Sequence, residues 1–203
     1  MTGKSFLSVF FLVFSSLLAR CSAADTLREG DILFQSNISP QCQAIKAATH
    51  SPYTHCGMIL KKDGALYVYE ALEPVMYTPL DEWVARSNKH YVAKRLKDTS
   101  LVTPAVIAKM KKAGEKYRGK HYDPYFEWSD ERIYCSELVW KLYKETTGLE
   151  LGVPLPLSSY YLSSDIVKKT MAQRYGNKIP LNEKMIAPSG IFESGLLMTV
   201  YSN

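Results

Sequence analysis

The sequence predicts an α+β fold in which antiparallel strands pack against helices. Two strand-like segments, residues 54–60 and 65–72, are joined by Asp63-Gly64, a pair typical of two-residue hairpin turns. Helical patterns with recognisable caps lie before and after this hairpin. No regular alternation of strand and helix is present, which argues against a parallel sheet.

The first 24 residues have the pattern of a secretory signal peptide. Lys4 precedes an apolar run from Phe6 to Leu18, and small residues follow up to Ala24. The run is too short and too rich in serine for a good membrane span. We therefore expect cleavage after Ala24 and export to the periplasm or the extracellular space.

A lipoprotein anchor at Cys21 is the alternative, but Arg20 stands where lipoprotein signals have a small residue. With cleavage after Ala24, residues 25–203 form one domain of 179 residues, enough for a sizeable core. Loss of Lys4 and Arg20 lowers the basic count from 25 to 23, against 20 acidic residues. This mildly basic balance, without a Lys/Arg run, argues against a nucleic-acid partner.

Each expected element has a local signal, taken in chain order. Strands are expected at 28–36, 54–60, 65–72, 90–96 and 196–201, and helices at 39–50, 78–87, 103–119, 134–148 and 164–176. Ser39 and Thr103 each precede a proline, the arrangement of an N-cap followed by the first helical residue. Thr78 precedes a proline in the same way, so the 78–87 helix is expected to start there.

The hairpin places His55 and Glu70 on one face of the sheet. A two-residue turn at Asp63-Gly64 puts Glu70 opposite Gly57 and diagonal to His55, and a four-residue loop would put His55 directly opposite Glu70. A carboxylate beside an imidazole fixes the ring tautomer and favours the protonated ring. An ordinary cross-strand polar pair on a solvated face is the alternative interpretation.

Cys135 lies at the junction between an acidic loop and a helix. It continues an apolar stripe with Leu138, Val139 and Leu142 at helical spacing. In the first turn, the positive helix end and unbonded N–H groups favour a thiolate and can bind an oxyanion. An inert, buried cysteine is the competing interpretation.

Three cysteines remain after cleavage: Cys42, Cys56 and Cys135. An odd number leaves one thiol unpaired in an oxidising compartment. One interpretation pairs Cys42 with Cys56 across about 15 residues, a loop that a disulfide stabilises by roughly 3 kcal/mol. Strand alternation points Cys56 away from the face of His55, so such a bridge need not block a cleft there.

A nucleophile on a helix, with His and a polar residue on an antiparallel sheet, is the arrangement of papain-like enzymes. Here the sheet residues come first in the chain, as in a circular permutation. The segments GDILFQ, ATHSPYTHCGMI, YVYEAL…VMYTPLDEW, YRGKHYD and WSDERIYCSELVWK resemble the YiiX/YaeF-type permuted papain-like amidases, relatives of NlpC-type peptidases and lecithin:retinol acyltransferase. The resemblance covers nearly all of residues 25–203. It implies a circularly permuted papain-like fold with Cys135 as nucleophile, His55 as base and Glu70 as the orienting residue.

Tyr122 corresponds to the tyrosine that NlpC-type relatives place beside the nucleophile. The resemblance implies that its hydroxyl stabilises an oxyanion or positions substrate; a half-buried aromatic without a role is the alternative. Cys42 and Cys56 stand where we expect small hydroxyl residues in relatives, which favours a disulfide peculiar to this chain. Disturbance of the site by a cysteine next to His55 is the alternative.

The expected function is hydrolysis of amide bonds through an acyl-enzyme, on cell-envelope peptides or N-acyl amino acids. A lipid acyltransferase or lipid hydrolase using the same site is one rival, and a non-catalytic binding protein is another. His50, His90 and His121 lack spaced partners typical of a zinc site, so no metal and no organic cofactor is expected. Aromatic residues are dense over 117–134, where they either line a cleft or cover the core edge.

Overall fold

The structure is a computed structural model that describes residues 26–36 and 38–203, so the expected signal peptide lies outside the described residues. The strands are β1 (Ile32–Gln35), β2 (His55–Lys62), β3 (Ala65–Glu70), β4 (Met76–Pro79), β5 (Val92–Leu96), β6 (Leu155–Pro156), β7 (Lys184–Met185) and β8 (Leu197–Ser202). The helices are α2 (Pro40–Thr49), α3 (Leu80–Arg86), α4 (Pro104–Glu115), α5 (Cys135–Thr147), α6 (Asp165–Tyr175) and α7 (Pro188–Phe192).

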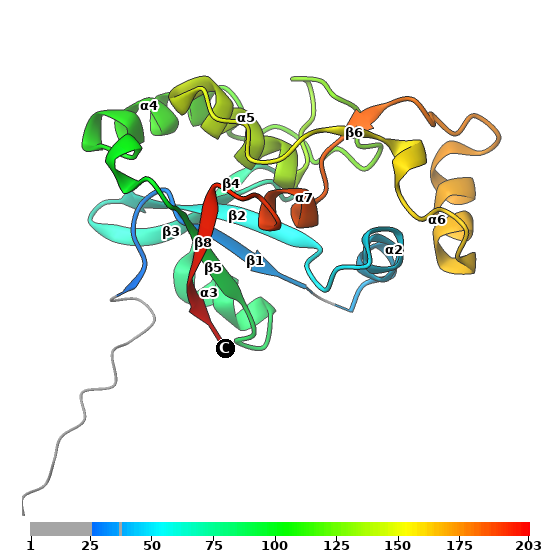
Figure 1. Ribbon diagram of the computed structural model, residues 1–203, viewed down its shortest axis with the longest axis horizontal. Coiled ribbons are helices and arrows are strands. Elements are labelled where there is room, and N and C mark those ends of the chain that lie inside the picture. Colours follow the sequence, from blue (N-terminus) through cyan, green and yellow to red (C-terminus); the bar gives the residue numbers. More distant parts are fainter. Residues whose placement is uncertain (1–25, 37) are drawn as a thin grey trace, which may run out of the picture.

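Six strands form one antiparallel sheet in the order β4-β3-β2-β1-β5-β8 (Figure 1). The sheet is open, and β6 pairs with β7 in a separate two-stranded sheet. The expected α+β class with an antiparallel sheet is therefore confirmed. The strands β4, β6 and β7 are additional to those expected, because they are too short to show a clear alternating pattern.

The β2–β3 hairpin has the two-residue turn that the sequence predicts. Lys62 pairs with Ala65, which leaves only Asp63 and Gly64 in the turn. Both turn residues have positive φ, 51° for Asp63 and 80° for Gly64, as a type I′ turn requires. The register that follows from this turn fixes the faces of the site residues.

Helices cover both faces of the sheet (Figure 1). On one face, α4 and α5 pack over alternate strand residues such as Cys56 and Met58. On the other face, Trp83 of α3 is fully buried against Leu33, Ile59 and Val68. The apolar stripe of α5 is confirmed, because Leu138, Val139 and Leu142 are all fully buried.

Of the three predicted N-cap residues, two cap a helix and one does not. The hydroxyls of Ser39 and Thr103 accept N–H groups in the first turns of α2 and α4. Thr78 is not a cap: α3 begins at Leu80 after Pro79, and the Thr78 hydroxyl donates to Glu70 instead. The α4 helix also ends at Glu115, three residues before Arg118, the last residue expected if Gly119 lies just past the end.

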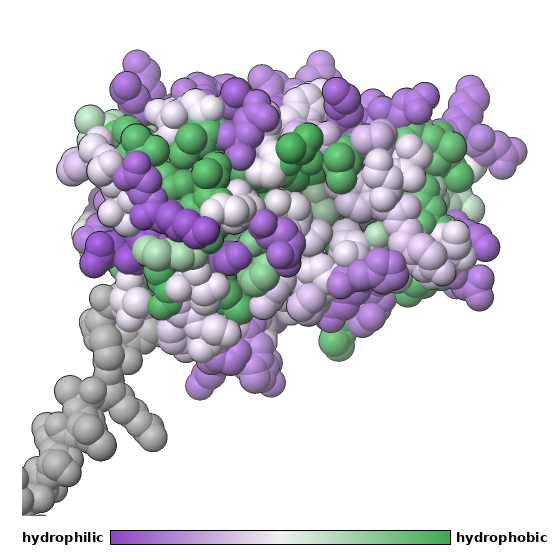
Figure 2. Space-filling model, in the orientation of Figure 1, coloured by the Kyte–Doolittle hydropathy of each residue, from purple (hydrophilic) through white to green (hydrophobic). Residues whose placement is uncertain are grey.

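At one end of the molecule, α2 and α6 lie side by side (Figure 1). On the face drawn in Figure 2, hydrophobic residues form separate patches between which hydrophilic residues lie. Within the part of the chain that the structure describes, no helix is long and apolar enough to cross a membrane.

Candidate active site

His55 and Glu70 are in direct contact at the edge of the hairpin. His55 begins β2 and Glu70 ends β3, and the His55 Nε2 lies 2.6 Å from the Glu70 Oε2. The shared face follows from the two-residue turn, as expected. This bond occupies Nε2 and leaves Nδ1 of the ring for a second partner.

Glu70 is fully buried and receives several donors besides His55. The Thr78 hydroxyl donates to its Oε1 over 2.5 Å, and the Trp83 Nε1–H donates to its Oε2 over 3.0 Å. The Arg86 guanidinium also pairs with Oε1. Burial alone raises the pKa of Glu70, but bonds from His55 and Thr78 and the charge of Arg86 outweigh burial and lower it.

Cys135 is the first residue of α5 and is 3% exposed. The first N–H groups of a helix have no hydrogen-bond acceptor within the helix. In α5 these groups lie at the end where Cys135 stands, so they remain available to a ligand there. Tyr134 precedes it at the N-cap position, and Leu138 N–H makes an early helical bond to Tyr134 over 3.0 Å. The predicted position of Cys135 at the positive end of a helix is therefore confirmed.

The charges of Cys135 and His55 shift each other's pKa values in opposite directions. Burial alone would lower the pKa of His55, but the thiolate of Cys135 and the carboxylate of Glu70 raise it to about 10. The pKa of Cys135 is well below the ordinary value, because a Cys56 hydrogen bond and the His55 charge outweigh burial. These directions favour a thiolate–imidazolium pair at neutral pH.

The expected disulfide is absent: Cys42, Cys56 and Cys135 are all buried free thiols. The expectation that Cys56 points to the face opposite His55 is confirmed. That face is covered by α5, and Cys56 lies close enough to Cys135 to lower the pKa of the Cys135 thiol. Burial and this neighbour raise the pKa of Cys56 well above its ordinary value, which keeps it a thiol that can donate.

Tyr122 is held beside Cys135 by a short pairing of the chain. A parallel bridge joins Tyr122 to Ile133, two residues before the cysteine. The Tyr122 hydroxyl accepts a hydrogen bond from Gln41 Nε2 over 3.2 Å. Burial and the nearby Cys135 charge raise the pKa of Tyr122 well above its ordinary value, so the hydroxyl keeps its proton and can donate it to a ligand.

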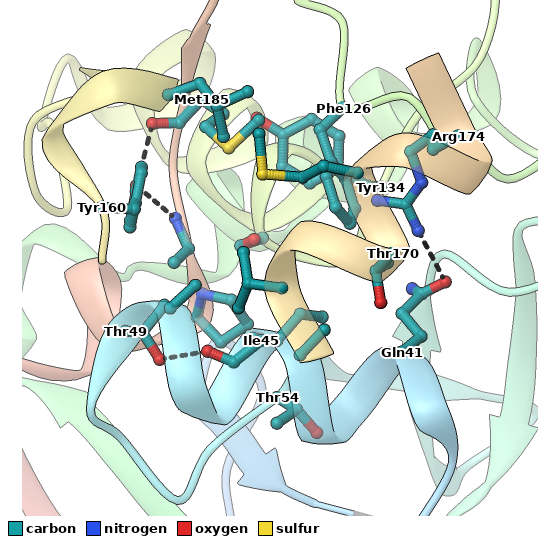
Figure 3. Close-up of a pocket in the computed structure, with 18 of the residues that line it drawn as sticks. Gln41, Ile45, Thr49, Thr54, Phe126, Tyr134, Tyr160, Thr170, Arg174 and Met185 are labelled. Carbon is teal, nitrogen blue, oxygen red and sulfur yellow. Dashed lines mark hydrogen bonds between the residues drawn. The ribbon is translucent and has the colours of Figure 1, made fainter. Parts of the chain in front are cut away.

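Two cavities meet at this site. An apolar cavity includes Cys135 in its wall, and a more polar cavity includes His55. Gln41, Thr54 and Tyr122 line both cavities. Figure 3 shows Gln41 and Thr54 at one border of the apolar cavity. If a substrate bond lies between Cys135 and His55, the substrate groups on the two sides of that bond would therefore lie in different cavities.

The aromatic segment 117–134 divides between the two expected roles. Tyr122, Phe126 and Tyr134 line the apolar cavity. Tyr117 is buried in the core and Trp128 packs edge-to-face against Trp140, away from that lining. The site also contains residues without an assigned role in the sequence interpretation, namely Thr78, Trp83, Arg86 and Gln41. The only signal for Thr78 and Trp83 was their place in the segment VMYTPLDEW, and Arg86 follows three positions after Trp83.

The fold and site define a class: the chain belongs to the permuted papain-like amidases of the YaeF/YiiX family, a family of cysteine amidases and peptidases. The family model matches residues 26–201. This confirms the fold and the family that the five sequence segments indicated.

Two relatives from Escherichia coli are similar over most of their length. The uncharacterized protein YiiX is 40% identical over 190 residues, which cover 93% of each chain. A crystal structure described as that of the metalloprotein YiiX superposes with a TM-score of 0.83 at 39% identity, covering 88% of this chain and 98% of the other.

Proposed function

We propose that this protein is an exported cysteine hydrolase that cleaves amide bonds with Cys135, His55 and Glu70. The observation that carries the proposal is the buried Glu70 carboxylate 2.6 Å from His55 Nε2, in a site where the Cys135 charge raises the pKa of His55. Cell-envelope peptides and N-acyl amino acids are the proposed substrates. A binding protein would not require this contact.

In the first step, the Cys135 thiolate attacks the carbonyl carbon and the carbonyl electrons move to oxygen. N–H groups at the start of α5 and the Tyr122 hydroxyl stabilise this oxyanion. The His55 imidazolium then gives its proton to the amide nitrogen, the C–N bond breaks, and the amine departs. The acyl group remains on Cys135 as a thioester.

In the second step, neutral His55 takes a proton from water, and the resulting hydroxide attacks the thioester. The acid departs, and the proton on His55 restores the ion pair with the released Cys135 thiolate. Glu70 keeps Nε2 of the ring protonated throughout, so Nδ1 exchanges protons with the thiol, amine and water. Thr78, Trp83 and Arg86 hold Glu70 in one orientation.

Acyl transfer to an amine or alcohol is the second candidate function. It uses the same acyl-enzyme, and the apolar cavity beside Cys135 favours it because such a wall suits a lipid acyl chain. Supplying glycerol or an amine during turnover distinguishes the two, since a transferase releases the acylated acceptor instead of the free acid.

The relative described as a metalloprotein makes a metal worth testing in this chain. Among residues 26–36 and 38–203, no three His, Cys, Asp or Glu side chains gather in a set that could hold a metal ion. His55 Nε2 is also occupied by Glu70. The described residues therefore do not fit a metal centre.

The experiment that tests the proposal is capture of an acyl-enzyme from cell-envelope extracts, followed by mass measurement. An added acyl mass on Cys135 is expected for the active protein and none for Cys135→Ala. His55→Ala should lower kcat/KM on the order of a thousand-fold, because the residues act as a unit. Undiminished hydrolysis in either variant would remove this mechanism.

A further inference from the structure

A chain of hydrogen bonds leads from α6 through α2 to Tyr122. Arg174 Nη2 on α6 donates to Gln41 Oε1 on α2 over 3.3 Å, a bond drawn in Figure 3. Gln41 Nε2 donates in turn to the Tyr122 hydroxyl over 3.2 Å. The guanidinium also lies over the Phe126 ring, 4.8 Å from its centroid, which holds Arg174 from a second side. The hydrogen-bond chain Arg174–Gln41–Tyr122 therefore connects α6 to the tyrosine beside Cys135.

Arg174 determines the orientation of the Gln41 amide. The oxygen and the nitrogen of a glutamine amide have nearly the same shape, but the oxygen accepts hydrogen bonds and the nitrogen donates them. A guanidinium has only donors, so the amide atom that faces Arg174 must be the oxygen. The nitrogen then faces Tyr122. Without Arg174, the amide could turn over and present its oxygen to the tyrosine.

The direction of the Gln41–Tyr122 bond determines where the Tyr122 proton goes. The tyrosine oxygen accepts from Gln41, so the single O–H of Tyr122 is not used in that bond. Burial and the nearby Cys135 charge raise the pKa of Tyr122, whereas the Arg174 charge and the Gln41 bond act against that rise. Both groups therefore draw electron density from the hydroxyl oxygen, which strengthens the O–H as a donor. This donor is available to the two cavities that Tyr122 lines.

We propose that Arg174 and Gln41 are positioning residues that keep the Tyr122 hydroxyl donating to the oxyanion formed at Cys135. Both act through Tyr122: Arg174 fixes the Gln41 amide, and Gln41 leaves the Tyr122 proton to the substrate. The inference rests on the proposed function, because the oxyanion forms when the Cys135 thiolate attacks a carbonyl group. It gives α6, which follows the nucleophile in the chain, a part in the reaction.

The first test measures stabilisation of the substrate oxygen without turnover, with N-acetyl-aminoacetaldehyde as the probe. The Cys135 thiolate adds to the aldehyde carbon, and the carbonyl electrons move to oxygen, which takes up the proton of the His55 imidazolium. The oxygen of this hemithioacetal lies where the oxyanion forms during hydrolysis. Protection of Cys135 against iodoacetamide gives the Kd of the aldehyde. Tyr122→Phe should raise this Kd about ten-fold, because it removes a hydrogen-bond donor to that oxygen.

Two variants of Gln41 distinguish control of the proton from simple packing. In Gln41→Glu, one carboxylate oxygen can still accept from Arg174, but the other accepts the Tyr122 proton. In Gln41→Met, the side-chain length is kept and nothing takes that proton. We expect Gln41→Glu to raise the Kd of the aldehyde about ten-fold, like Tyr122→Phe, and Gln41→Met only about three-fold. A packing role predicts the reverse order, because glutamate is the closer replacement, and that order would overturn the proposal.

A double-mutant cycle tests Arg174. Arg174→Met should lower kcat for the chromogenic amide 4-nitroacetanilide about ten-fold and leave KM nearly unchanged, but it should cause no further loss in the Tyr122→Phe background. Arg174→Lys should keep most of the activity, because an ammonium group also has only donors. Lys169→Met is the matched control for loss of a positive charge on α6, since Lys169 is exposed and outside both linings. The same loss from Arg174→Met in both backgrounds would refute the proposal.

Aldehyde binding separates failure of this inference from failure of the proposed function. The expected order of Kd values, in a protein that forms no acyl-enzyme with envelope extracts, would support the hydrogen-bond chain and refute the amidase. Hydrolysis of 4-nitroacetanilide together with one Kd for the wild type, Gln41→Glu and Arg174→Met would refute the inference alone. The iodoacetamide rate without aldehyde should be equal in these three proteins, because alkylation forms no oxyanion. A fall of this rate in both variants would show that they disturb Cys135 itself and would overturn the proposal.

Discussion

Glu70 shows how one buried side chain organises the site. The carboxylate is fully buried and accepts donors from His55, Thr78, Trp83 and Arg86. Each oxygen therefore has a fixed set of partners, and the ring of His55 has one orientation. A buried charge with this many donors is stable only while they remain in place.

We expect Glu70→Gln to keep part of the amidase activity and Glu70→Ala to lose more. The glutamine oxygen can still accept the His55 N–H, but its amide group must face Thr78 and Arg86, which are donors to the wild-type carboxylate. The measurement is kcat/KM of both variants on one amide substrate. Negligible losses in both would place Glu70 outside the catalytic machinery.

The Cys135–His55 pair predicts how alkylation depends on pH. Because the pKa of Cys135 is well below 9, the ordinary pKa of a cysteine thiol, the thiolate persists as the pH falls below 9. Because the pKa of His55 is raised to about 10, the ring keeps its charge up to about pH 10. The iodoacetamide rate at Cys135 should therefore stay high at neutral pH. His55→Ala should move the midpoint of this profile upward, and an unmoved midpoint would refute the ion pair.

Among the secondary-structure elements, the β2–β3 pair depends on a glycine. A Cβ on Gly57 would lie 2.4 Å from Val68 Cγ1 and 3.0 Å from the Glu70 Cβ. Only glycine therefore lets β3 approach closely enough to set Glu70 against His55. Packing at this point links the stability of the hairpin to the geometry of the site.

Gly57→Ala should destabilise the fold by about 1–3 kcal/mol, because it overpacks a buried strand pair. Thermal unfolding monitored by circular dichroism gives the change, and activity should fall with it as Glu70 is displaced. Gly195→Ala is the matched control, since its added Cβ meets nothing within 4 Å. An equal melting temperature for the wild type and Gly57→Ala would contradict the packing argument.

The packing of α5 on β2 leads to a different expectation for the thiols. Because Cys42, Cys56 and Cys135 are all free thiols, all three should be alkylated in the active protein after denaturation without reductant. Peptide mass spectrometry counts them. A Cys42–Cys56 disulfide in the active protein would refute the structural arrangement of thiols, though not the role of Cys135.

At the scale of the whole molecule, the N-terminal segment predicts the cellular location of the protein. The N-terminal pattern predicts export with loss of residues 1–24, so the mature chain should begin at Asp25. N-terminal sequencing of protein from the periplasmic fraction tests this. Replacing Leu17 and Leu18 with arginine should block processing, because the apolar core of the signal would be broken; a correctly processed double variant would argue against a signal peptide.

Sequence patterns were sufficient to predict the features that depend on neighbouring residues. The caps Ser39 and Thr103, the turn at Asp63-Gly64 and the start of a helix at Cys135 all follow from local backbone chemistry. The two-residue turn also sets the strand register that places His55 and Glu70 on one face of the sheet, because side chains alternate along a strand.

Contacts between side chains from distant segments depend on how the helices pack on the sheet, which local patterns do not predict. Thr78 has the pattern of a cap, yet the buried Glu70 carboxylate takes its hydroxyl, because an unpaired buried charge costs more than an uncapped helix. Strand alternation correctly turned Cys56 away from His55, but it could not show that α5 brings Cys135 to that same side. The two cavities likewise arise where α2 and α6 meet segments distant in the chain, and no local pattern records such contacts.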